Sequence, residues 1–283
     1  MAWPLGLDLV ATHDMLAEGV HFTRDCPPAD IGWKLVAVNL SDLAAMGAKP
    51  VAVLLGVGIG TDRDAPWAIA LLSGVRQALG RFGGALVGGD TIRAGEATVL
   101  SLTALGSVPP RAALGRAGAA AGDDLWVSGT IGDAGLGLQV ALGERAADPA
   151  LLKRYRRPTP RLALGVALRG VATAAMDVSD GLFIDAARLG EASGLGCEIA
   201  LDAVPLSDAA RASGVAVEAL AAMGDDYELL FAAPSSARAA VAEAAARASV
   251  PVARIGGMHE GKGLHLRRGG ANMPLPARLG FTH

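Results

Sequence analysis

Aromatic residues are scarce in this chain of 283 residues, because phenylalanine, tryptophan and tyrosine together make up only 4% of it. Since 52% of the residues are hydrophobic, the core must be built mainly from alanine, valine and leucine, as is common where helices pack on sheets. This composition excludes a disordered chain. The length is sufficient for two domains of ordinary size, each with its own core.

Cysteine is limited to Cys26 and Cys197, which are far apart and lack the spacing of a metal site. We therefore expect buried, unreactive thiols in a protein of the reducing cytoplasm. Long apolar runs are missing as well, and the stretch over residues 51–59 is broken by glycine and is far shorter than the roughly 20 residues of a membrane-spanning helix. The N-terminus shows no secretory signal, so no membrane partner is expected.

Positive charge is not concentrated in any part of the sequence. The net charge is -3, and the four lysines are widely separated. A surface of this kind does not attract a polyanion, and no run of lysine or arginine alternates with aromatic residues. Nucleic acid is therefore not an expected partner.

Apolar periodicity predicts strands that alternate with helices, which is typical of an α/β protein. In the first half we expect strands over residues 7–12, 51–59, 85–87 and 98–108, and helices from residue 30 and over residues 64–82. In the second half we expect strands over residues 124–128, 174–178, 197–201, 227–232, 252–255 and 264–266, and helices over residues 134–142, 161–169, 182–192 and 236–248. Residues 154–160 are expected to form an exposed connector.

A domain boundary is expected where two prolines, Pro109 and Pro110, precede a stretch rich in arginine, alanine and glycine. We place an N-terminal domain at residues 1–112 and a C-terminal domain at residues 120–283. Residues 256–262 spell G-x-x-x-x-G-K, but Gly263 follows where a phosphate-binding loop has serine or threonine, and a strand follows where it has a helix. We interpret this segment as a hairpin loop.

Aspartate recurs in five short segments without the histidine or cysteine clusters of a zinc site. They are residues 13–14, 39–42, 88–91, 177–181 and 224–228. Carboxylates of this kind suit Mg²⁺ that is held jointly by protein and phosphates. The leading hypothesis is therefore an enzyme that uses a nucleotide.

Each segment also has a simpler interpretation. Gly88 and Gly89 would let the backbone approach a phosphate while Asp90 reaches a metal, but a turn and a helix cap would explain the same residues. Residues 177–181 fit a strand, turn and helix cap equally well. Asp42 lies in an apolar helix, where a buried carboxylate needs a partner or a metal unless it is exposed. His21 could contact a substrate or be a structural residue. Asp225 and Asp226 could face a positively charged ring or cap a turn before a strand.

Taken together, the segments resemble the thiamine-monophosphate kinase family, within the superfamily of aminoimidazole-ribonucleotide synthetase-like enzymes. The resemblance spans nearly the whole chain in order. It rests on residues 12–22, 38–48, 88–91, 177–182 and 226–231. It implies an N-terminal α/β domain that pairs with its twin in a homodimer, forming a dimeric sheet or barrel with ATP bound near the interface, and a C-terminal α/β domain that completes each site.

The resemblance also implies the reaction and the residues that serve it. The γ-phosphoryl group of ATP would pass to the phosphate of thiamine monophosphate, giving thiamine diphosphate and ADP. Mg²⁺ would be held by Thr12, Asp14, Asp42, Asp90, Asp177 and Asp180, of which Asp42, Asp90 and Asp180 would be catalytic. ATP would contact Gly89, Asp90, Arg116 and Ser179. Thiamine monophosphate would contact His21, Asp225 and Phe281.

Elementary electrostatics agrees with this scheme, because two phosphate-bearing substrates repel each other until cations neutralise them. The sequence leaves open whether K⁺ is a further cation. It also leaves open a relative of the dehydratase or cyclase type, which uses ATP on another substrate. A third alternative is a nucleotide-binding relative without catalysis, because the Gly-x-x-Asp-Asp-type metal motif of the family is not found before Leu7.

Overall fold

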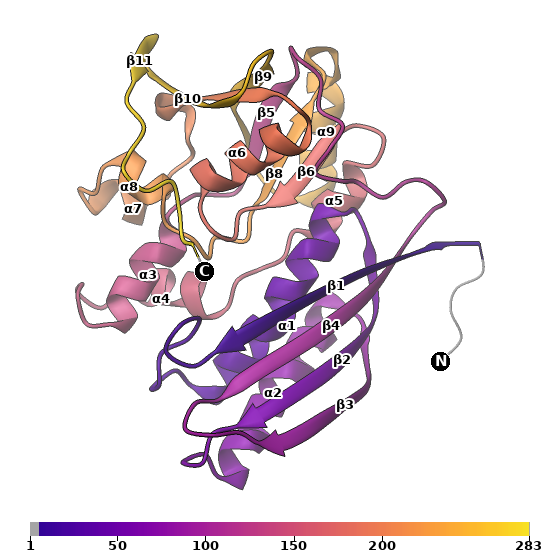
Figure 1. The fold of residues 1–283 in the computed structure, drawn as a ribbon, viewed down its shortest axis with the longest axis vertical. Helices are drawn as coiled ribbons and strands as arrows, with labels where there is room; N and C mark the ends of the chain where they lie inside the picture. Colours follow the sequence, from indigo (N-terminus) through magenta and orange to yellow (C-terminus); the bar gives the residue numbers. More distant parts are fainter. Residues whose placement is uncertain (1–5, 283) are drawn as a thin grey trace.

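The computed structural model describes residues 6–282, which form two sheets with helices packed on them (Figure 1). The first half contains a four-stranded sheet in the order β1-β4-β2-β3. Its strands are β1 (Asp8–Ala17), β2 (Lys49–Ile59), β3 (Ala85–Arg93) and β4 (Val99–Val108). β4 runs antiparallel to both β1 and β2, whereas β3 is parallel to β2.

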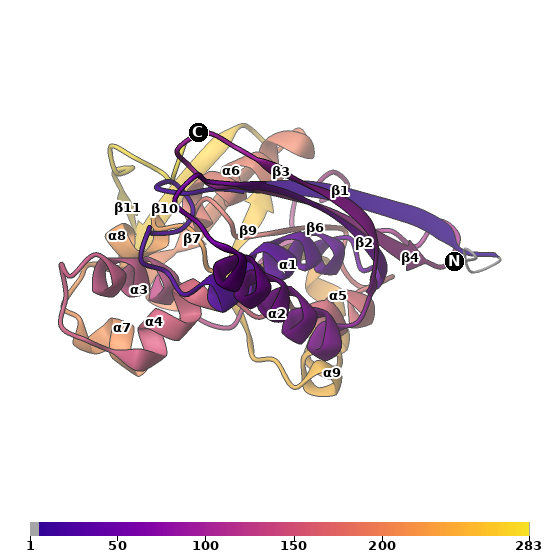
Figure 2. The same ribbon diagram turned by 90° about the horizontal axis from the view of Figure 1, so that it is seen from below.

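One face of this sheet is covered by α1 (Pro28–Ala45) and α2 (Ala65–Phe82), as Figure 2 shows. α2 begins where the Asp64 carboxylate accepts a hydrogen bond from the Trp67 amide at 2.9 Å. The two helices approach closely because glycine lies at their contact. A Cβ atom on Gly74 would lie 1.9 Å from the Ala29 carbonyl oxygen.

The α1 helix is buried on most of its circumference, which explains why its sequence is apolar almost throughout. Leu35 and Leu40 belong to the core beneath the four-stranded sheet. Ala44 packs in a different cluster with residues of the second half, where a Cβ atom on Gly165 would lie 1.9 Å from the Ala44 carbonyl oxygen. α1 therefore joins the two halves, and side chains on it can reach both.

The second half contains a seven-stranded sheet in the order β11-β10-β7-β9-β5-β8-β6. Its strands are β5 (Asp124–Ser128), β6 (Ala174–Asp177), β7 (Gly196–Ala200), β8 (Leu229–Ala233), β9 (Val252–His259), β10 (Gly263–Arg268) and β11 (Ala271–Met273). Its helices are α3 (Asp133–Ala141), α4 (Pro149–Arg156), α5 (Leu162–Ala167), α6 (Leu182–Ala192), α7 (Asp208–Ala212), α8 (Val217–Ala221), α9 (Arg238–Ala248) and the short η1 (Leu201–Ala203) and η2 (Ser235–Ala237). α6 lies on one face of the sheet and α5 and α9 on the other (Figure 2).

The mixed α/β architecture with two units is the one that the sequence predicts, but four local expectations were wrong. β1 continues to Ala17, so Asp14 lies within a strand and not at its end. β3 continues to Arg93, so residues 88–91 are extended and do not form a turn. Residues 154–156 belong to α4, which starts at an Asp148 cap. β9 and β10 form no hairpin, because β7 lies between them.

Both sheets are open within the described residues, so a barrel would require a second copy of the chain. Over residues 6–282, no helix is long and apolar enough to cross a membrane. Cys26 and Cys197 are free and buried, as expected. Burial raises the pKa of Cys26 to about 11 and that of Cys197 to about 12, so both thiols are unreactive at neutral pH.

Candidate active site

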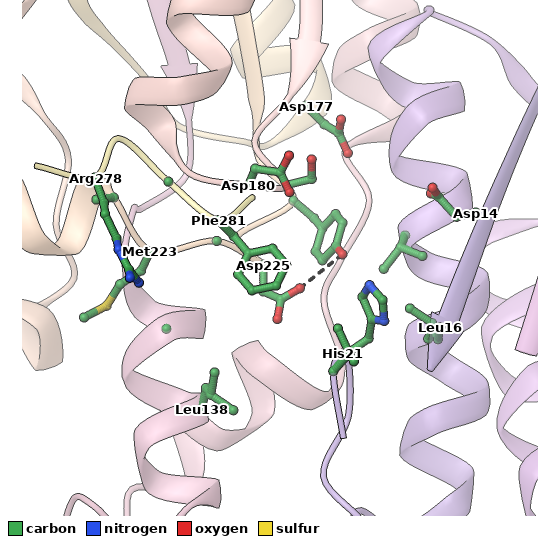
Figure 3. Close-up of a pocket in the computed structure, with 18 of the residues that line it drawn as sticks. Asp14, Leu16, His21, Leu138, Asp177, Asp180, Met223, Asp225, Arg278 and Phe281 are labelled. Carbon is green, nitrogen blue, oxygen red and sulfur yellow. Dashed lines mark hydrogen bonds between the residues drawn. The ribbon is translucent and has the colours of Figure 1, made fainter. Parts of the chain in front are cut away.

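A cavity of about 740 Å³ lies between the two halves of the molecule, a size usual for small-molecule sites (Figure 3). Its walls come from the helices α1, α3 and α6, from β1 and the loop after it, from the linker after β4, from the loops that follow β6 and precede β8, and from the C-terminal segment. Nine of the predicted site residues line it: Asp14, His21, Asp42, Arg116, Asp177, Ser179, Asp180, Asp225 and Phe281. Folding thus brings together residues from four of the five aspartate segments.

One wall of the cavity is acidic and is fastened by hydrogen bonds between β1 and α1. Thr12 does not line the cavity, but its hydroxyl donates to the Asp42 carboxylate at 2.5 Å. The Asp14 amide donates to the side-chain oxygen of Asn39 at 3.0 Å. Asn39 and Asp42 therefore face β1 together, as their spacing on a helix predicts.

Asp177 faces this wall from the other half of the molecule, at the end of β6. Burial raises its pKa well above the usual range, and the negative charge of Asp42 raises it further. Burial also raises the pKa of Asp42, although the Thr12 hydrogen bond and the positive charge of Arg116 oppose this. Asp42 is half-buried and Asp177 is buried, and two such carboxylates that disfavour each other's charge form a place where a cation is stabilised.

This arrangement fits Mg²⁺. Among residues 6–282, no three histidine, cysteine, aspartate or glutamate side chains meet in a ready-made metal site. Mg²⁺ usually takes only one or two carboxylates from a protein and completes its shell with water and substrate phosphates. Asp42 and Asp177 supply such a pair, so the residues present suit a metal that arrives with a nucleotide.

The loop that carries Ser179 and Asp180 is held from below by Asp185 in the first turn of α6. One oxygen of Asp185 accepts hydrogen bonds from the amides of Ser179, Asp180 and Gly181 at 3.1, 3.1 and 3.2 Å. Burial raises the pKa of Asp185 to about 6. The predicted ATP and metal residues of this loop are therefore fixed in position before any ligand binds.

Positive charge at the cavity comes from Arg116, Arg188 and Arg278. Arg188 donates to Asp180 at 2.5 Å and to Asp185 at 2.9 Å. Guanidinium groups are suited to phosphate oxygens, so the cavity combines anion-binding and cation-binding groups. Only Arg116 was predicted from the sequence. The position of Arg188 three residues after Asp185 on a helix was the signal that could have revealed it.

The four side chains of the segment from Asp225 to Glu228 lie in different surroundings. Asp225 and Tyr227 line the cavity, and Tyr227 also packs in the core of the first half, whereas Asp226 and Glu228 are buried and do not line the cavity. Asp225 and Tyr227 adopt positive φ angles of 70° and 50°. A non-glycine residue in this conformation costs free energy, so the surrounding contacts must hold the segment in place.

Asp226 caps the N-terminal end of α3. Its carboxylate accepts hydrogen bonds from the Gly132 amide at 2.7 Å and the Ala134 amide at 3.3 Å. Burial raises the pKa of Asp226 to about 8, while these two amides oppose the shift. From the sequence we expected Asp226 to face a positively charged ring or to cap a turn before a strand; it caps a helix instead.

Glu228 is fully buried and neutralised by arginines. It accepts hydrogen bonds from Ser128 at 2.6 Å, from Arg154 at 2.9 Å and from both Nε and a terminal nitrogen of Arg161. Because Arg154 lies on α4 and Arg161 precedes α5, this network ties the loop that carries Asp225 to the helical side of the second half. The expected exposed connector is therefore part of the support of the site.

Gly89 and Asp90 are not brought to the cavity within one chain. They lie on the exposed edge strand β3, and β4 and β2 separate this strand from β1. A Cβ atom on Gly89 would lie 2.0 Å from the Leu55 carbonyl oxygen, so a glycine is needed for β3 to approach β2. The Asp90 carboxylate accepts a hydrogen bond from the Thr91 amide at 2.8 Å.

Comparison with known proteins supports the sequence resemblance. Residues 2–108 match the model of the AIR synthase related protein N-terminal domain, and residues 120–268 match that of the C-terminal domain. The thiamine-monophosphate kinase of Caulobacter vibrioides is 41% identical over 98% of this chain and 81% of its own length. The chain belongs to the thiamine-monophosphate kinase family.

Solved structures of this family share the fold. The thiamine-monophosphate kinase of Stenotrophomonas maltophilia K279a has a TM-score of 0.86 at 38% identity, covering 94% of this chain and 87% of that one. A structure described as AaThiL complexed with AMPPCP and TMP has a TM-score of 0.84 at 32% identity, covering 94% and 85%. The predicted family and its two-domain α/β fold are therefore confirmed.

Proposed function

We propose that this protein is a thiamine-phosphate kinase, which transfers the γ-phosphoryl group of ATP to thiamine monophosphate and releases thiamine diphosphate and ADP. The observation that carries the proposal is the pairing of Asp42 with Asp177 across the junction of the two halves, inside the cavity. It is supported by relatives that are named thiamine-monophosphate kinase at up to 41% identity. It is also supported by the related structure described as AaThiL complexed with AMPPCP and TMP, since AMPPCP is an ATP analogue.

In this proposal Asp42 and Asp177 hold Mg²⁺, with Asp14 and Asp180 beside them and Thr12 orienting Asp42. The metal would neutralise phosphate charge, which is the main obstacle when two phosphorylated substrates meet. Arg116 and Ser179 bind ATP at the fixed loop, and Asp42 and Asp180 are the catalytic residues of this chain. No protein nucleophile is needed, because the acceptor phosphate itself attacks.

The acceptor binds at the opposite part of the cavity, against His21, Asp225 and Phe281. Figure 3 shows all three side chains at this cavity, with Asp225 and Phe281 coming from the second half and His21 from the first. An aromatic ring, an imidazole and a carboxylate suit a heteroaromatic substrate with a positively charged ring. The Phe281 amide donates to the Asp180 carbonyl oxygen at 2.8 Å, so the C-terminal segment stays at the site.

Asp90 and Gly89 enter the proposal through a homodimer. The outer face of the four-stranded sheet exposes apolar side chains, among them Leu9, Leu54 and Ile92, and β3 is an unpaired edge within the described residues. An exposed apolar face next to an open edge is typical of an association surface. We infer that two copies pair through this sheet into a shared sheet or barrel, so that Asp90 reaches ATP and Mg²⁺ from the partner.

We propose that the chain has two domains and that the protein acts in the cytoplasm. We place the N-terminal ATP-binding and dimerisation domain at residues 1–112 and the C-terminal domain at residues 120–283. We propose the cytoplasm as the compartment, since both thiols are free. A requirement for K⁺ is to be measured in the same assay as activity.

The test measures ADP release by the purified protein with ATP and Mg²⁺, with and without K⁺, for a panel of acceptors. Thiamine monophosphate should stimulate release strongly, and thiamine, which lacks the acceptor phosphate, should not. Stimulation by a carbamoyl or formylglycinamidine substrate instead would favour the dehydratase or cyclase alternative. Binding of ATP without any turnover would favour the relative without catalysis.

A further inference from the structure

Lys34 is a buried lysine that the proposed chemistry does not use. It lies on α1, and only 2% of its surface is exposed. Its ammonium group donates to the Asp225 carboxylate at 3.0 Å and to the His21 carbonyl oxygen at 2.9 Å. The same group lies 4.1 Å from the centre of the Tyr155 ring.

A lysine in this position is costly unless every donor has a partner, because removing an ammonium group from water is strongly unfavourable. Its partners come from three other segments: the loop after β1, the loop before β8, and α4. The first belongs to the N-terminal half and the other two to the C-terminal half. Lys34 therefore joins both halves at the side of the cavity where Asp225 and His21 lie.

The contacts of Lys34 determine how Asp225 presents its carboxylate. One oxygen accepts from Lys34, and the other accepts from the Tyr227 hydroxyl at 3.1 Å. Each carboxylate oxygen can accept a second hydrogen bond, so each retains acceptor capacity for a ligand. Asp225 has a positive φ angle of 70°, so its placement needs support from its contacts. Its amide donates to the Ser179 carbonyl oxygen at 2.8 Å, and the two side-chain partners hold the carboxylate.

The backbone of His21 is fixed by the same lysine. The His21 carbonyl oxygen accepts from Lys34, and the His21 ring nitrogen Nδ1 accepts from the Ala17 amide at 3.0 Å. Both ends of the residue are thus held. Two of the three proposed acceptor contacts, His21 and Asp225, depend on one ammonium group.

We propose that Lys34 is a positioning residue for the acceptor substrate, which orients the Asp225 carboxylate and the His21 backbone without touching ATP. This inference rests on the proposed function of the cavity. It predicts that loss of the ammonium group weakens the use of thiamine monophosphate and leaves the use of ATP unchanged.

The test compares Lys34→Met with Arg157→Met as a matched control. Arg157 also joins the second half to α1, through an ion pair with Asp30 at 2.5 Å. Unlike the hydrogen-bond partners of Lys34, Asp30 does not line the cavity. Lys34→Met should raise KM for thiamine monophosphate about tenfold, the effect of losing hydrogen bonds to a charged group, with KM for ATP unchanged. Arg157→Met should change neither constant.

Two further measurements keep the test decisive. If Lys34→Met does not fold, Lys34→Arg can be measured in its place. It retains the positive charge but replaces the compact ammonium group with a planar guanidinium group, so it should still raise KM for thiamine monophosphate and leave KM for ATP unchanged. In an Asp225→Asn background, Lys34→Met should raise KM for thiamine monophosphate by a smaller factor than in wild-type protein, because part of the effect of Lys34 passes through the Asp225 carboxylate.

Three outcomes would overturn the inference: an unchanged KM for thiamine monophosphate, an equal rise in both constants, or full additivity with Asp225→Asn. Turnover of thiamine monophosphate by wild-type protein shows whether the proposed function or only this inference has failed. Failure of wild-type protein to use thiamine monophosphate overturns both, whereas normal wild-type turnover with an unaffected Lys34→Met overturns the inference alone.

Discussion

The loop at residues 225–228 and the edge segment at residues 88–91 show how differently two short acidic motifs can be supported. In the loop, each carboxylate has partners from other elements, and Glu228 is fully buried under two arginines. On the edge, all residues of β3 are exposed, and Asp90 bonds with the neighbouring Thr91 amide. Contacts with other parts of the same chain hold the side chains of the loop in place, whereas within residues 6–282 the side chain of Asp90 on the edge hydrogen-bonds only with its neighbour in the strand.

This difference separates two ways to build a site for charged substrates. A preorganised wall lowers the cost of binding because its groups need not reorient. A motif on an open edge becomes part of a site only when something covers it. We therefore propose that the acidic wall of each site belongs to one chain and that Asp90 reaches that site from a partner chain.

The largest loss of turnover is expected from a substitution in the acidic wall, at Asp42. Asp42→Asn removes a carboxylate that we propose as a ligand of Mg²⁺, and metal stabilisation of developing charge is worth several kcal/mol, or about a thousandfold in rate. Turnover should fall by about this factor while the melting temperature stays within a few degrees. Turnover near that of wild-type protein would contradict the assignment of Asp42.

A somewhat smaller effect, about a hundredfold in rate, is expected for Asp90→Asn, since it removes one of several charges at the site. Co-expressing tagged Asp42→Asn and Asp90→Asn chains tests where Asp90 acts. If each site takes Asp90 from the partner, the mixed dimer has one site with both changes and one intact site, so activity returns. Activity no higher than in either parent would show that Asp90 and Asp42 serve the same chain.

The support of the loop can be tested without touching the cavity. Glu228→Gln leaves Arg154 and Arg161 without their buried counter-charge, which should lower the free energy of unfolding by about 2 kcal/mol. Urea denaturation measures this loss. Ser128→Ala, which removes a neutral partner of the same carboxylate, is the control and should cost less. An unchanged midpoint for Glu228→Gln would mean that the network does not stabilise the loop.

The smallest effect is a pH dependence at Asp226. Burial raises its pKa to about 8 in the folded protein, above the usual 3.8. A raised pKa means that the stabilising contribution of the protonated acid is complete at low pH and is lost as the pH rises through 8. Asp226→Asn cannot ionise, so thermal unfolding should show it gaining stability relative to wild-type protein as the pH rises from about 4 to about 8. A difference that does not vary with pH would contradict the shift.

The sequence predicted the parts of the site that depend on local order. Asn39 and Asp42 were correctly placed on one face of a helix, and Ser179 and Asp180 between a strand and a helix, because these positions follow from periodicity. Lys34, Arg154 and Glu228 were missed because their roles depend on contacts between residues far apart in the chain. The extension of β3 was missed because two glycines favour a turn locally, whereas pairing with β2 keeps them extended.

The most direct test of the central claim follows the transferred group. Wild-type protein is incubated with thiamine monophosphate, Mg²⁺ and ATP labelled in its γ-phosphate, and Asp42→Asn is the control. The account predicts that the label appears in the terminal phosphate of thiamine diphosphate, in an amount equal to the ADP formed, and that Asp42→Asn yields almost none. Label found only in inorganic phosphate, or no transfer by wild-type protein, would contradict it.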